Sequence, residues 1–107
     1  MLTALADGRI VVFDVESTGT DTTTAEIIQI AAVRLDAQGQ VTDKFNTYVR
    51  ASRSVGTSFY VHHISDDQLA VEGRDPKQAL SAFLAFARDA VIVGPNVTYD
   101  LSLLHLS

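Results

Sequence analysis

Runs of apolar residues divide the chain, and their composition is typical of strands. Residues 10–15 (IVVFDV) are apolar and β-branched, which predicts a central strand. Residues 26–35 (EIIQIAAVRL) and 41–49 predict two more strands, and the turn segment AQGQ at 37–40 predicts that they form an antiparallel hairpin. Residues 51–58 predict a loop, and residues 90–93 a short buried strand.

Helix signals occupy the segment between the third and the last of these strands. Ser65 and Gln68 fit a capping box, which predicts a short helix starting at SDDQLA. Asp75 can cap a second helix, in which Pro76 suits the first position. The apolar residues that follow recur at helical spacing, at Leu80, Phe83, Leu84 and Ala87. This spacing predicts an amphipathic helix of roughly three turns.

The end of the chain predicts one further helix. The segment GPN at 94–96 breaks the chain, and Asn96 can cap a helix that runs through Asp100 to the end. The strongest elements then follow the order β-β-β-α-β-α. This order predicts an α/β sandwich that begins with a hairpin meander and adds a strand by a helical crossover.

Composition limits the class of protein. A chain of 107 residues with 47% hydrophobic residues can form one small domain with a modest core. It has no cysteine, which excludes disulfides and thiolate metal sites. The start MLTALADGR resembles neither a signal peptide nor a membrane span, so we expect a cytoplasmic protein without a membrane partner. The net charge of −5 disfavours broad clamping of a nucleic-acid duplex but allows a chain end to bind through metal ions.

Asp14 and Glu16 form an acid pair in the first predicted strand. Side chains at positions i and i+2 of a strand point to the same face, about 7 Å apart along the chain. Two carboxylates on a buried face repel each other unless a cation compensates them, and the basic residue nearest in sequence is Arg9. Oxygen ligands favour Mg²⁺ or Mn²⁺ over zinc. The residues alone leave a second interpretation open, a strand end where both acids simply reach water.

Asp100 is a second candidate acid. In the predicted last helix, Asn96 and Asp100 share a face with Leu103 or Leu104, and an acid on an apolar helix face needs a partner. The alternative is an exposed aspartate near a helix N-terminus, where the helix dipole favours negative charge. Asp100 by itself does not separate these two interpretations.

Four blocks of the sequence together resemble a known family. FDVESTG, EIIQIAAVRL, VHHISDDQL and VGPNVTYDLSLL are similar to successive blocks of the DEDD 3′–5′ exonucleases. The similarity is greatest to the proofreading exonucleases of bacterial replicative polymerases and to helicase-associated exonuclease domains. The first family motif, D-x-E-[TS]-[TS]-G, matches residues 14–19, and the second, N-x-x-x-D, matches Asn96 and Asp100. The resemblance implies a ribonuclease H-like α/β fold, a mixed sheet with an antiparallel meander and a helical crossover.

The sequence departs from the family pattern at three places. Pro95 stands where members commonly have histidine, and proline should stiffen this turn without removing a carboxylate. His63 replaces the usual glycine of a V-H-G-I block, at a position where a positive φ angle is expected. The third motif, a histidine followed by an aspartate, does not occur after Asp100. We therefore expect residues 1–107 to be the N-terminal two-thirds of a single, C-terminally incomplete exonuclease domain, inactive alone, or a domain that no longer cuts.

The resemblance also implies roles for individual residues. Two Mg²⁺ or Mn²⁺ ions would be bound by Asp14, Glu16 and Asp100, with Asp14 bridging both ions. The groups expected to contact the substrate are Ser17 and Thr18 at the 3′-terminal nucleotide, His62 at the base pocket, and Asn96. His62 has an equally plausible interpretation as a histidine of the loop that binds no ligand.

The implied substrate is a nucleic-acid 3′ end, with single-stranded DNA favoured over RNA, and the implied partner is a polymerase or helicase, fused or separate. Two other classes stay open. A haloacid-dehalogenase-like phosphatase also places an acid pair at a strand end, but it needs aspartate where this chain has Glu16, and this chain has no suitable downstream lysine. The other is a non-catalytic exonuclease-like interaction module, which the missing third motif favours and the intact acids disfavour.

Overall fold

The computed structural model describes residues 9–19, 25–52 and 54–94, and its centre is a four-stranded mixed sheet. In chain order the strands are β1 (Ile10–Ser17), β2 (Ile27–Leu35), β3 (Val41–Tyr48) and β4 (Val91–Val93). Their order across the sheet is β3-β2-β1-β4; β2 pairs antiparallel with both β1 and β3, whereas β4 pairs parallel with β1. The predicted hairpin meander and helical crossover are therefore confirmed.

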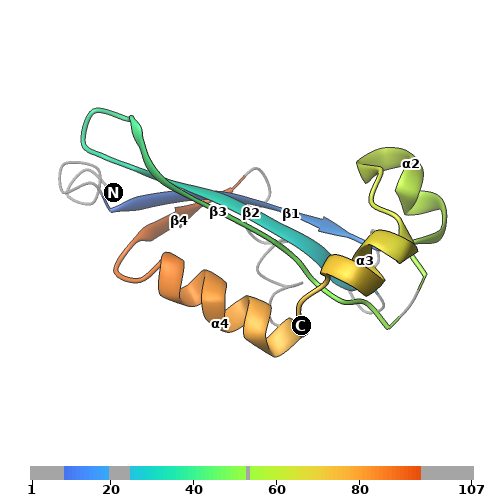
Figure 1. The fold of residues 1–107 in the computed structure, drawn as a ribbon. Coiled ribbons are helices and arrows are strands. Elements are labelled where there is room, and N and C mark those ends of the chain that lie inside the picture. Colours follow the sequence, from blue (N-terminus) through green and yellow to red (C-terminus); the bar gives the residue numbers. More distant parts are fainter. Residues whose placement is uncertain (1–8, 20–24, 53, 95–107) are drawn as a thin grey trace.

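In the part of the chain that the structure describes, the helices come between β3 and β4 in the sequence. They are the 3₁₀ turn η1 (Gly56–Ser58), α2 (Phe59–His62), α3 (Asp66–Glu72) and α4 (Pro76–Phe86). Helix α4 lies along one face of the sheet, while α2 and α3 lie together at the end toward which β1 points (Figure 1). The predicted α3 and α4 are confirmed, whereas η1 and α2 were not predicted. Among the described residues, no helix is long and apolar enough to cross a membrane.

Both predicted helix caps are present. The Ser65 hydroxyl accepts a hydrogen bond from the Gln68 backbone N–H at 3.0 Å, and α3 begins at the next residue. The Asp75 carboxylate accepts from the N–H groups of Lys77 (3.1 Å) and Gln78 (3.3 Å) ahead of α4. Each cap satisfies donors that have no partner inside the first helical turn, which explains why both helices begin where the sequence predicted.

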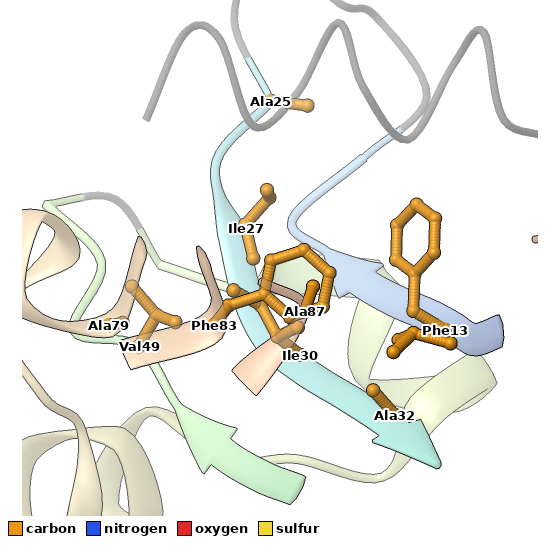
Figure 2. Close-up of a cluster of buried hydrophobic side chains, with 10 residues drawn as sticks. Phe13, Ala25, Ile27, Ile30, Ala32, Val49, Ala79, Phe83 and Ala87 are labelled. Atoms are coloured by element: carbon orange, nitrogen blue, oxygen red, sulfur yellow. The ribbon is translucent and has the colours of Figure 1, made fainter. Parts of the chain in front are cut away.

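The main core lies between α4 and the sheet. Phe83 is fully buried, with its ring centroid 5.4 Å from that of Phe13 on β1 and 6.0 Å from that of Phe45 on β3. Figure 2 shows Phe83 among the apolar side chains of this cluster. Phe83, one of the apolar residues that recur at helical spacing, is therefore a core residue. The inclusion of Leu84 in the buried stripe was wrong, since Leu84 is 55% exposed and lies about 100° around the helix from Phe83.

A smaller core holds α3 and the preceding loop against the end of the sheet. Its buried members are Ile28, Val55, Ile64 and Leu69. The pairing of β1 with β2 is irregular between Glu16 and Ser17, so that Ile28 is an additional residue on β2. This bulge lets the neighbouring residues Ile27 and Ile28 both be buried, Ile27 in the main core and Ile28 in the smaller one.

Candidate active site

Asp14 and Glu16 project from the side of β1 that faces away from the main core. Val11 and Phe13, which alternate with them along the strand, are buried in that core, whereas Asp14 is exposed and Glu16 is partly buried. The expectation that both acids lie on a buried face was wrong, because the helix covers the opposite face of β1. Because Asp14 is exposed, its carboxylate does not require a compensating cation. A metal site is supported instead by the position of the two carboxylates and by the type of their donor atoms.

Neutral residues lie beside the acid pair on β2. The register places Ala31 opposite Asp14 and Gln29 opposite Glu16. The Gln29 side-chain amide donates to Asn46 Oδ1 at 2.9 Å, and Asp14 Oδ1 accepts from the backbone N–H of Val15 at 3.0 Å. The Asp14 carboxylate thus lies beside the short methyl side chain of Ala31.

The acid pair also lies toward the carboxyl end of β1, beyond its pairing with β4. Strand β4 pairs with β1 only as far as Val12, which is opposite Val93, whereas β1 continues to Ser17. Open α/β sheets bind ligands outside the carboxyl ends of their strands, where neighbouring connections run in different directions. The chain leaves β4 beside the acids. Asn96 and Asp100 follow Val93 by three and seven residues in the sequence and lie outside the described residues.

The turn after β1 is anchored to the start of β2. The Thr18 backbone N–H donates to the Glu26 carbonyl at 2.9 Å, and the Glu26 N–H donates to the Thr18 hydroxyl at 3.0 Å. The Ser17 hydroxyl donates to the Gly19 carbonyl at 2.6 Å. Because the Thr18 hydroxyl is the acceptor in its bond, it keeps a hydrogen that it can donate to a ligand. Substrate binding by Ser17 and Thr18 stays a prediction.

His62 makes hydrogen bonds within its own segment. Its Nδ1 accepts from the Ile64 backbone N–H at 3.0 Å, and its Nε2 lies 2.9 Å from the Ser58 hydroxyl, which in turn donates to the Val55 carbonyl at 2.5 Å. These bonds place the ring proton on Nε2. The geometry gives His62 a structural role at the end of α2, and its role in a base pocket stays a prediction.

His63 has the backbone conformation expected from the family pattern. Its φ of 61° and ψ of 24° lie in the left-handed region that usually favours glycine. Its ring meets Phe59 edge-on, with the ring centroids 5.9 Å apart. This chain adopts the positive φ angle with a histidine, although a side chain at this position was expected to resist it.

Two carboxylates that the sequence did not single out hold the loop before α2. The Glu26 carboxylate accepts from the Ser52 backbone N–H at 2.7 Å and from the Ser52 hydroxyl. The Asp66 carboxylate accepts from the Val55 N–H at 2.8 Å and the Ser54 hydroxyl at 2.7 Å, and these two bonds lower its pKa. Only contacts between distant segments reveal these roles, so no local signal could have found them.

The described residues supply part of a possible metal site. Asp14 and Glu16 offer hard carboxylate oxygens on one face, the donor type that Mg²⁺ and Mn²⁺ prefer. In residues 9–19, 25–52 and 54–94, no group of three or more His, Cys, Asp and Glu side chains is placed to hold a metal ion. The donor chemistry fits such a cation, and the third predicted ligand, Asp100, lies outside these residues.

The fold and the site define an α/β domain in which the central strand of a mixed sheet presents two acids toward its carboxyl end. Comparison with known proteins shows the same class. The profile of the family described as Exonuclease matches residues 11–105, and the chain belongs to this family. The resemblance to the DEDD exonucleases, and to the exonuclease of bacterial DNA polymerase III in particular, is confirmed.

Bacterial polymerases are among the similar proteins. The chain is 35% identical over 101 residues to a PolC-type DNA polymerase III of Thermotoga maritima and 33% identical over 101 residues to one of Staphylococcus aureus. Each alignment covers 94% of this chain and 7% of the polymerase. The chain therefore corresponds to a small part of these relatives.

Solved exonuclease structures have the same fold. A structure of exonuclease I without ligand aligns with a TM-score of 0.82 at 17% identity, covering 92% of this chain and 24% of the other. E. coli exonuclease I in complex with a dT13 oligonucleotide aligns with a TM-score of 0.79 at 18% identity, covering 89% and 22%. These likenesses confirm the predicted ribonuclease H-like α/β exonuclease fold.

Proposed function

We propose that this chain is the N-terminal part of a metal-dependent exonuclease domain that, when complete, removes nucleotides from the 3′ end of single-stranded DNA. The observation that carries the proposal is the position of Asp14 and Glu16, which share one face of the central strand at its carboxyl end, beyond the pairing with β4. Family membership supports the nuclease class. The polarity, the metal and the substrate are the proposed part.

Asp14 and Glu16 would hold the metal ions, and Asp100 would be the third carboxylate ligand. When bound, a pair of Mg²⁺ or Mn²⁺ ions would activate the attacking water and stabilise charge on the scissile phosphate. The exposure of Asp14 and the small Ala31 beside it leave access for a phosphate at this face.

Thr18 and Ser17 would position the terminal nucleotide. Their turn follows the acid pair directly. The two hydrogen bonds between Thr18 and the backbone of Glu26 hold this turn in place relative to β1 and β2. The Thr18 hydroxyl, which retains its hydrogen, would donate to an oxygen of that nucleotide. Asn96 and His62 remain further candidates for substrate contact.

The proton-accepting group is not among the residues discussed so far. In the family that this chain belongs to, the third motif is expected to provide a histidine base and a further aspartate, and neither follows Asp100 in the printed sequence. General-base help is worth about 10²–10⁴-fold. We therefore propose that residues 1–107 alone are inactive and that cleavage needs a group supplied from elsewhere.

Single-stranded DNA is the proposed substrate because of what similar proteins are named for and carry. The relatives described above are DNA polymerases, and one exonuclease I structure contains a dT13 oligonucleotide. A net charge of −5 suits the capture of a chain end better than the clamping of a long duplex. A polymerase, fused or separate, is the proposed partner.

The test is cleavage of a 5′-labelled single-stranded oligonucleotide, with Mn²⁺, by the full-length protein. By this we mean a protein in which residues 1–107 are completed by a third-motif histidine and aspartate. We expect products that shorten progressively from the 3′ end, and no cleavage by Asp14→Asn. Asp43→Asn is the matched control, because Asp43 is an exposed strand residue whose Oδ1 also accepts from the next N–H, that of Lys44, at 2.9 Å.

Three results would contradict the proposal. Cleavage by Asp14→Asn at nearly the wild-type rate would mean that the acid pair is not the catalytic site. Products shortened from the 5′ end would contradict the polarity. A folded full-length protein that does not cleave with Mn²⁺ would favour the non-catalytic interaction module instead.

A further inference from the structure

Glu26 connects three segments near the acid pair. Its backbone N–H and carbonyl make the two bonds to Thr18 described above, at 3.0 and 2.9 Å. Its carboxylate accepts from the backbone N–H of Ser52 at 2.7 Å and from the Ser52 hydroxyl. One residue at the start of β2 thus joins the turn after β1 to a loop 26 positions later in the chain.

The loop that Glu26 holds leads to the 3₁₀ turn η1, which α2 follows. Asp66 holds the other end of the same loop through the Val55 N–H (2.8 Å) and the Ser54 hydroxyl (2.7 Å). The segment between these two carboxylates and α3 contains His62, whose ring is fixed by bonds to its own backbone and to Ser58. Glu26 therefore links the Thr18 turn to the loop that precedes the segment carrying His62.

The type of bond makes this link suited to positioning. Hydrogen bonds that ionised carboxylates accept are shorter and roughly twice as strong as neutral ones. Ser52 is exposed and Glu26 is only partly buried, so the contact lies at the surface and outside both apolar cores. The contact contributes to the relative position of two loops more than to the packing of the core.

We propose that Glu26 is a positioning residue for the substrate: its backbone holds the Thr18 turn, which would contact the 3′-terminal nucleotide, and its carboxylate braces that turn against the loop at Ser52. The inference rests on the proposed function. Small displacements of positioning groups can cost up to about 10²-fold in rate. Loss of the carboxylate should therefore affect substrate binding more than the folding of the domain.

The test compares Glu26→Ala and Glu26→Gln in the full-length protein, with Mn²⁺ and a single-stranded oligonucleotide, well below the melting temperature. We expect Glu26→Ala to lower kcat/KM by roughly tenfold, mainly through a higher KM. Glutamine can accept from the Ser52 N–H and donate to the Ser52 hydroxyl, so Glu26→Gln should stay within about threefold of wild type.

Asp36→Ala is the matched control. The Asp36 carboxylate also accepts from two backbone N–H groups, those of Gln38 and Gln40, both at 2.9 Å, in the turn between β2 and β3. This substitution removes equivalent bonds from a turn that has no proposed contact with substrate. It should lower the melting temperature without changing KM.

Hydrogen exchange gives a readout that does not depend on cleavage. The Ser52 amide should exchange faster in Glu26→Ala than in wild type, because its acceptor is lost, and should be restored in part in Glu26→Gln. A wild-type protein without activity would overturn the proposed function. An active wild type, with Glu26→Ala unchanged in KM or changed no more than Asp36→Ala, would overturn the positioning role alone. Unchanged exchange at Ser52 would overturn the link itself.

Discussion

The residue opposite Asp14 offers a sharp test of where a cation binds. Ala31 lies across from Asp14 in the antiparallel pair of β1 and β2, so the two Cβ atoms are about 4.5–5.5 Å apart. Ala31→Lys adds a positive charge beside the carboxylate, whereas Ala31→Met adds a neutral side chain of similar length. The difference between the two variants isolates the effect of charge from the effect of size.

The size of that effect follows from Coulomb's law. At a separation of about 6 Å in water, a lysine ammonium and a divalent cation repel each other by about 1.4 kcal/mol, which is a tenfold change in affinity. Asp14 is exposed, so the dielectric constant of water is appropriate. At about 0.15 M salt the Debye length of about 8 Å lowers the effect to roughly threefold, while at about 0.01 M most of it remains.

The assay is the Mn²⁺ concentration that gives half-maximal cleavage by the full-length protein. We expect this concentration to be about tenfold higher for Ala31→Lys than for Ala31→Met at low salt, and the ratio to fall as salt is added. Equal values for the two variants at low salt would refute the reasoning, because a cation held by Asp14 cannot be insensitive to a charge on the adjacent strand.

Two further predictions concern the scaffold. Phe83→Ala should lower the free energy of unfolding by about 3–5 kcal/mol, because it empties the centre of the main core. Leu84→Ala should lower it by less than about 1 kcal/mol, because Leu84 is exposed. Denaturant titration measures both values, and equal losses would contradict the position of α4. The hydrogen bond from the Val55 N–H, and to a lesser extent that from the Ser54 hydroxyl, lower the pKa of Asp66 from the ordinary 3.8. The stabilisation that ionised Asp66 provides is therefore complete above pH 3.8. It is lost as the pH falls through the lower pKa of the folded state. In acid titrations the stability of wild type should therefore fall more steeply below pH 3.8 than that of Asp66→Asn, and parallel curves would contradict this role.

Most elements could be predicted because their signals are local. The β-branched runs predicted all four strands, and the strand bounds differ by only one or two residues from those observed. The caps at Ser65 and Asp75 act on backbone groups within three residues, so the sequence alone reveals them. The positive φ angle at His63 came from the resemblance to a family in which glycine is usual at that position.

The features that were missed depend on contacts across the fold. Helix α2 has only four residues, too few to show a helical period. The exposure of Asp14 depends on which face of β1 a helix covers, and alternation along a strand does not reveal that. The bond between Glu26 and Ser52 joins residues 26 positions apart, so it exists only once the sheet and the loop have come together.

Calorimetric titration of Mn²⁺ into the full-length protein tests the central claim most directly, because it needs neither a substrate nor the base. Asp14 and Glu16 are the proposed cation ligands at the carboxyl end of β1. We expect wild type and Asp43→Ala to bind Mn²⁺. Asp14→Ala should bind Mn²⁺ at least about tenfold more weakly, because breaking one charged contact typically costs more than about 1.4 kcal/mol. Equal Mn²⁺ binding by Asp14→Ala and wild type, or no binding by a folded wild type, would contradict it.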